Sequence, residues 1–175
     1  MATLSGMTTL VITVVGDDRA GLVASLADIV DAHGGNWETS ELAELAGAFA
    51  GIVEVSVAAE RSDDLRAALE AAAGTLRVTV HGPAPVPATA ARTVALTVMG
   101  NDRPGIVREI TGALSARGAS IDRMSTQTTD AAMAGGRLFE ASLTATLAGG
   151  GGVDELVEDL QNLAAEIQVD VTLTD

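Results

Sequence analysis

The sequence predicts an α+β fold built from two copies of one small unit, each with the order β-α-β-β-α-β. The first supporting observation is an internal repeat. Residues 9–23 return 84 positions later as residues 93–107, and eight of those fifteen positions are identical. The second observation is that apolar residues change within each copy from strand-like to helix-like spacing. A long repeat without gaps indicates two copies of one structural unit, and 175 residues suffice for two small domains.

In the first copy, the opening run is β-branched and apolar, which is typical of a buried strand. A Gly-containing turn follows, and apolar residues at helical spacing then continue to His33-Gly34-Gly35, a usual helix stop. Ser62 is expected to be the N-cap of a second helix. We therefore expect a strand at 9–15, a turn at 16–21, a helix from 22 to about 33, strands at 36–46 and 47–59, a helix at 61–73 and a strand at 76–80.

The second copy repeats this order. Aligning Glu54 with Glu140 changes the offset between the copies from 84 to 86, which predicts two additional residues in the middle loop of the second copy. The expected elements are a strand at 92–99, a turn at 100–105, a helix from 106 to about 117, strands at 120–128 and 137–147, a helix at 153–165 and a strand at 167–173.

The order β-α-β-β-α-β is the ferredoxin-like arrangement, an antiparallel sheet with both helices on one face. Three prolines within five residues mark a semi-rigid linker between the copies. We expect one domain at 1–81, a linker at 82–91 and a second domain at 92–175. Because the domains are small and each sheet leaves one face uncovered, we expect a homo-oligomer, with a dimer favoured.

Charge and composition exclude several classes of function. The net charge is −14 and the chain has no Lys, so direct nucleic-acid binding is not expected. The absence of Cys excludes disulfides and thiolate metal sites, and two isolated histidines do not suggest a metal site. No cofactor is expected. No segment resembles a secretion signal or could span a membrane, so we expect a cytoplasmic protein without a membrane partner.

The turns carry a family resemblance. Gly100-Asn-Asp-Arg-Pro-Gly-Ile-Val107, after an apolar strand and before a helix, resembles the signature of the ACT domain. Residues 16–23 are similar, with Ala20 where the family commonly has Pro. The stretch Arg117-Gly-Ala-Ser-Ile-Asp122 also resembles the family, and His33-Gly-Gly-Asn-Trp-Glu38 matches it more loosely. The resemblance covers residues 8–81 and 91–174.

This resemblance implies a regulatory module that binds a small molecule, most often an amino acid, and that is not an enzyme. Two ACT domains alone resemble the glycine cleavage system transcriptional repressor family, which makes glycine or serine the first expectation for the ligand. The expected partner is a protein, either a regulator or a metabolic enzyme. In the family, ligands lie between two ACT units, against the first turn of one and the second strand of the other.

The turn chemistry fits such a ligand, because an amino acid needs donors for its carboxylate and an acceptor for its ammonium. Free N–H groups at a helix start supply donors, and Asp102 or Asn101 supplies the acceptor. Arg19 and Arg103 either bind the ligand carboxylate or pair with the neighbouring Asp. The candidate ligand-binding residues are Asn101, Asp102, Arg103, Pro104, Gly105 and Ile106 in the second turn, Asp17, Asp18, Arg19, Ala20, Gly21 and Leu22 in the first, and Asn36 and Ser120 at the second strands.

A purely structural interpretation of the second turn stays open. In it, Asp102 accepts N–H groups of the turn or of the first helical turn, and Pro104 occupies the first helical position. Gly105 then lets the helix approach the sheet closely. An ACT assembly module without a ligand also stays open. An acylphosphatase-like enzyme would use Asn101 and Arg103, but the acylphosphatase-type motif around them is absent. An RNA-binding sheet lacks the aromatic and basic residues that it requires.

Overall fold

The computed structural model describes residues 6–71, 76–82, 91–130, 136–148, 153–162 and 167–174. The chain divides into two compact units, Met1–Val86 and Pro87–Asp175. Most of the predicted linker, residues 83–90, lies outside the described residues, so its conformation stays a prediction.

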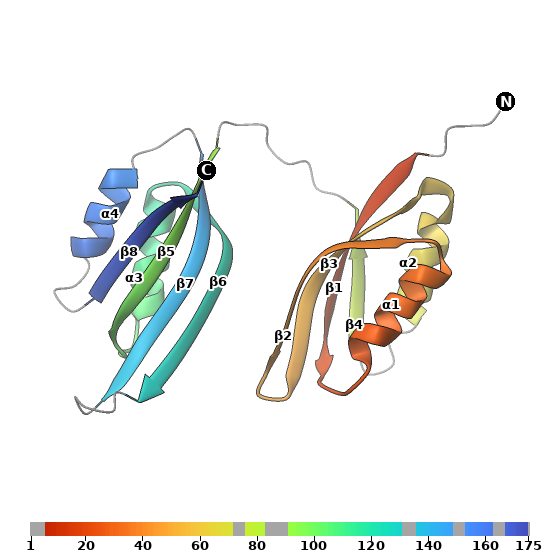
Figure 1. Cartoon of the computed structure of the whole chain (residues 1–175), viewed down its shortest axis with the longest axis horizontal. Coiled ribbons are helices and arrows are strands. Elements are labelled where there is room, and N and C mark those ends of the chain that lie inside the picture. The colour runs from red at the N-terminus through yellow and green to blue at the C-terminus, as the bar shows by residue number, and fades with distance from the viewer. Residues whose placement is uncertain are drawn as a thin grey trace. The chain divides into compact units, whose positions relative to one another are not determined.

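Both units have the predicted order of elements (Figure 1). The first unit consists of β1 (Met7–Asp17), α1 (Leu22–Ala32), β2 (Asn36–Leu45), β3 (Ala48–Ala58), a 3₁₀ turn (Ala59–Arg61), α2 (Ser62–Ala71) and β4 (Leu76–His81). The second consists of β5 (Ala91–Asn101), α3 (Ile106–Ala116), β6 (Ala119–Asp130), β7 (Arg137–Ala148), α4 (Val153–Asn162) and β8 (Ile167–Thr174).

Each unit forms one four-stranded sheet. The strand orders are β2-β3-β1-β4 and β6-β7-β5-β8, and every pair of neighbouring strands is antiparallel. Both helices of a unit lie against one face of its sheet (Figure 1). This confirms the ferredoxin-like α+β fold. It also places the first strand of each unit in the middle of its sheet, so the turn that follows this strand has neighbours on both sides.

The register of the third strands corrects the predicted loop length. Val15 pairs with Ala50, whereas Met99, its equivalent 84 residues later, pairs with Glu140. The third strands are therefore offset by 90 residues, and the second unit has six additional residues in its hairpin instead of two. The same offset of 90 residues relates Phe49 and Phe139. Each is buried and pairs with a glycine of the central strand. Aligning Glu54 with Glu140 was wrong because Ala50 is the structural equivalent of Glu140.

Each unit has its own core between the sheet and its helices. In the first unit Leu10, Ile12 and Val14 alternate along β1 and meet apolar residues of α1 and α2. The second core repeats this with Val94, Leu96 and Val98 on β5. Among the described residues no charged or polar side chain is buried. The cores therefore stabilise the fold, and the described polar and charged side chains lie at or near the surface.

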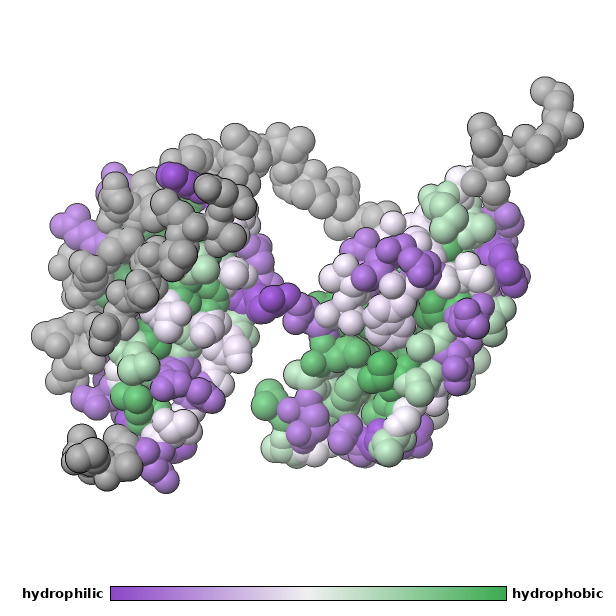
Figure 2. Space-filling model, in the orientation of Figure 1, coloured by the Kyte–Doolittle hydropathy of each residue, from purple (hydrophilic) through white to green (hydrophobic). Residues whose placement is uncertain are grey.

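The open faces of the two sheets differ in character. On the first sheet, Val15 and Ile52 are 46% and 53% exposed, and Figure 2 shows hydrophobic surface on the lower part of this unit. The corresponding positions on the second sheet are Met99 and Ser142, by the register given above. Ser142 replaces Ile52 within a largely polar row of Ser, Thr and Gln residues along β6 and β7.

One predicted cap is wrong. Ser62 is the first residue of α2, and its hydroxyl donates to the carbonyl of Ala59 at 2.8 Å. Its backbone is already helical, with φ of −64° and ψ of −38°, so Ser62 lies inside the helix and is not the N-cap. The 3₁₀ turn at Ala59–Arg61, which the sequence did not predict, leads directly into this helix.

Candidate functional site

The two strand-to-helix turns have the same backbone geometry. Helix α1 begins after Gly21 and α3 begins after Gly105, with φ of 88° and 92° respectively. A side chain at this left-handed φ is strained, which explains why both copies have glycine there. A Cβ at Gly105 would meet only Glu109 and Arg108 side-chain atoms, beyond 3.6 Å, so backbone conformation and not close helix–sheet packing requires this glycine.

A backbone hydrogen bond holds each turn to the start of the third strand. The N–H of Asp18 donates to the carbonyl of Gly47 at 2.9 Å, and the N–H of Asp102 donates to the carbonyl of Arg137 at 2.8 Å. By register these are equivalent contacts in the two units. The carboxylates of Asp18 and Asp102 are thus presented by a fixed backbone beside the start of a helix.

Neither helix start has a side-chain cap. Within the described residues, no side-chain cap hydrogen bond is found at Gly21 or Gly105, so the structural role predicted for Asp102 as a first-turn acceptor receives no support. Pro104 precedes the N-cap and is not the first helical residue. The first-turn N–H groups of both helices therefore lack the side-chain partner that usually satisfies them, and they carry the positive end of the helix dipole.

Arg103 pairs with Glu109 across the turn. Its guanidinium donates to both carboxylate oxygens of Glu109, at 2.9 Å and 2.6 Å, in a bidentate ion pair across the turn. This hydrogen bond lowers the pKa of Glu109, against a smaller effect of burial that raises it. Arg137 is an ion-pair partner of Asp102, with its Nη1 3.9 Å from Oδ2. The second turn is thus nearly neutral.

The first turn has a different charge distribution. Ser25 occupies the position of Glu109, and its hydroxyl donates to the carbonyl of Gly21 at 3.0 Å. Arg19 consequently has no ion-pair partner among the described residues. Asp17 adds a second carboxylate where the other turn has the neutral Asn101. The first turn therefore has one more negative charge than positive, whereas in the second turn the charges balance.

Asn36 and Ser120 do not join the turn residues within their own units. Asn36 pairs with Ser56, which pairs with Thr9 at the far end of β1 from the turn. Ser120 has the equivalent position opposite Thr146. At about 3.3 Å per residue, the seven residues from Thr9 to Gly16 span roughly 23 Å. A ligand could contact a turn and one of these residues only if they came from different units.

A β-bulge at the start of each second strand holds a carboxylate. In the first unit, Glu38 accepts hydrogen bonds from the hydroxyl of Ser56 and from Asn36 Nδ2, the latter at 2.9 Å. The hydrogen bond from Ser56 and then that from Asn36 lower the pKa of Glu38. In the second unit, Asp122 accepts from Thr146 Oγ1 at 2.7 Å. The Asn36 amide is therefore already engaged with a carboxylate of its own strand.

The sequence did not indicate a polar cavity between β6 and β7. It is lined by Ser125, Thr126, Gln127, Glu140 and Ser142. Alternating polar residues on an edge strand usually indicate only a solvated face, so the pattern alone carries little information. The cavity depends on Gln127 facing Glu140, and this pairing follows from the hairpin register, which the sequence alone does not set.

Comparison with known families decides the classification. Two ACT domain models match the chain, one over residues 8–82 and the other over residues 94–165. The chain belongs to the ACT domain family. It contains two ACT domains in tandem, and the matches cover both strand-turn-helix segments described above. No curated protein matches this tandem ACT chain.

Two solved structures share the tandem arrangement. An unknown protein from Galdieria sulphuraria is 29% identical with a TM-score of 0.86, over 97% of this chain and 100% of that one. A protein proposed to be a glycine cleavage system transcriptional repressor is 22% identical with a TM-score of 0.65, over 97% and 98% of the two chains. The second similarity shows the fold alone. Within the described residues, no helix is long and apolar enough to cross a membrane.

Proposed function

We propose that this tandem ACT protein is a non-catalytic regulator that binds a small amino acid at its strand-to-helix turns. One observation supports the proposal. At Gly105 a helix begins without a side-chain cap, and the Asp102 carboxylate lies in the same turn. The N–H groups suit the ligand carboxylate, and Asp102 suits its ammonium. Arg103 has a positioning role here, because Glu109 already holds its guanidinium.

The second turn is the preferred site. A bound carboxylate would lie near Asp17 in the first turn, where like charges repel, and near the neutral Asn101 in the second. Asn36 and Ser120 would contribute from a facing unit, which requires association of two ACT units in a homodimer or within the chain. Glycine or serine is the first choice of ligand, because ACT modules commonly sense amino acids and one neighbour is a proposed glycine cleavage repressor.

The binding signal would pass to a protein. An amino acid that prefers one packing of two units shifts the population of that packing and so alters a partner surface. The net charge of −14 disfavours direct contact with a phosphate backbone, so control of transcription would act through a DNA-binding regulator. A metabolic enzyme is the other class of partner. An assembly module without a ligand is the alternative function.

The test is thermal unfolding of the full chain against the twenty amino acids at millimolar concentration. A ligand at about 100 times its Kd adds roughly 2.7 kcal/mol, which raises the Tm by several degrees in domains of this size. Asp102→Asn should remove the shift, while Asp28→Asn, at an exposed site on α1, should retain it. If no amino acid raises the Tm, the assembly module replaces the sensor.

A further inference from the structure

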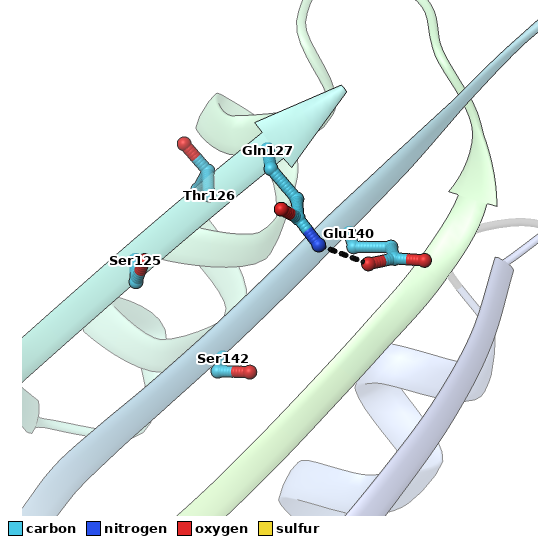
Figure 3. Close-up of a pocket in the computed structure, with 5 residues that line it drawn as sticks. All are labelled: Ser125, Thr126, Gln127, Glu140 and Ser142. Carbon is cyan, nitrogen blue, oxygen red and sulfur yellow. Dashed lines mark hydrogen bonds between the residues drawn. The ribbon is translucent and has the colours of Figure 1, made fainter. Parts of the chain in front are cut away.

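The second unit has a shallow cavity on the open face of its sheet, separate from the turns. Its volume is about 170 Å³, which is smaller than the pockets that hold drug-sized ligands. Ser125 pairs with Ser142 and Gln127 pairs with Glu140, so these four side chains stand together on one face (Figure 3). Their strand neighbours Phe139 and Ala141 point the other way, into the core. At a volume of about 170 Å³, the cavity has room only for a small ligand.

The lining presents hydrogen-bond acceptors around one negative charge. Gln127 Nε2 donates to Glu140 Oε2 at 2.5 Å, as Figure 3 shows. Because a carboxylate only accepts, this contact fixes the amide orientation and leaves the Gln127 carbonyl oxygen as an acceptor. The hydroxyls of Ser125 and Ser142 can accept as well. The cavity lining contains no cationic side chain, and Glu140 forms no ion pair with any described residue.

We propose that this cavity binds the ammonium group of a small primary amine. An ammonium has three N–H donors, and the Glu140 carboxylate, the Gln127 carbonyl and a serine hydroxyl supply three acceptors. An anion would meet the Glu140 charge without a compensating cation. A neutral polyol would leave that charge without a counter-ion. The net charge of −14 also raises the local concentration of small cations near the protein.

The first unit provides an internal comparison. By the register of the two hairpins, Ser125 and Gln127 correspond to Glu41 and Ala43, and Glu140 and Ser142 correspond to Ala50 and Ile52. Three of these four positions are apolar in the first unit. These hydrogen-bond acceptors are therefore present together on only one of the two sheets. This proposal is independent of the proposed function, because no residue of either turn contributes to the cavity.

The test is a titration of the full ¹⁵N-labelled chain with ethylammonium chloride at pH 7, monitored by amide NMR at constant ionic strength. We expect saturable shifts at Ser125–Gln127 and Glu140–Ser142, including the Gln127 side-chain amide, and none with sodium acetate. Glu140→Gln should weaken binding about tenfold, since it removes the charged acceptor. Glu54→Gln, an exposed site on the open face of the first sheet, should leave binding unchanged.

Three results would overturn the proposal: no saturable shift with ethylammonium, equal shifts with glycerol, or tighter binding of Ca²⁺ at the same residues. If Glu140→Gln perturbs the spectrum beyond the cavity, Ser142→Ala replaces it, with a severalfold weakening expected. Asp102→Asn separates the two proposals. It should abolish the amino-acid effect at the turn and leave ethylammonium binding intact, so either proposal can fail without the other.

Discussion

At the scale of single residues, the Arg103–Glu109 pair makes stability depend on pH. The Arg103 hydrogen bond lowers the pKa of Glu109 in the folded state below its ordinary value of about 4.3. A carboxyl whose folded pKa is depressed contributes stability above its unfolded pKa and loses it as the pH falls through the folded pKa. In Glu109→Gln, this pH-dependent contribution should be absent. Urea unfolding at several pH values should show the gap in stability between wild type and variant closing as the pH falls below about 4.3, the unfolded pKa. A gap of constant size would contradict this.

Replacing each of two glycines with alanine should change stability in opposite directions. A Cβ at Gly51 on β3 would collide with the Glu41 carbonyl oxygen and the Leu42 side chain, and would lie 3.0 Å from Leu42 Cα. Gly51→Ala should therefore destabilise the protein by about 1–3 kcal/mol.

Gly112 lies within α3 with open space around it, so Gly112→Ala should stabilise the protein by about 0.5–1 kcal/mol. The urea midpoints of both variants test this, and a loss of stability in Gly112→Ala would refute the second half.

At the scale of elements, the sequence predicted the order and type of the described α-helices and strands, though not the 3₁₀ turn at Ala59–Arg61, because hydrophobic period and glycine turns are local signals. It could not predict partners that depend on register. Glu109 lies six residues from Arg103, a spacing that corresponds to no helical pair, so the ion pair was missed. The pairing of Gln127 with Glu140 was not predicted, because the sequence does not set the register of the β6–β7 hairpin.

At the scale of the whole molecule, repetition provides two versions of one turn with different chemistry. Both turns share a glycine at positive φ, Gly21 and Gly105, and the repeat shows this glycine in the sequence; the shared backbone bond from each turn to the third strand depends on the hairpin register and was not predicted. The differences, such as Ser25 in place of Glu109, determine the charge of each turn and required the structure to interpret. Asn36 and Ser120 were predicted from the family resemblance, and they lie too far from the turns to share a ligand within one unit.

An amide NMR titration of the full chain with glycine and serine tests whether a small amino acid binds at the uncapped helix start of the second turn. We expect shifts at Asp102–Arg108 at lower ligand concentration than at Asp18–Ala24, since the first turn carries the additional carboxylate of Asp17. An absence of shifts at both turns, or shifts confined to Ser125–Gln127 and Glu140–Ser142, would contradict it.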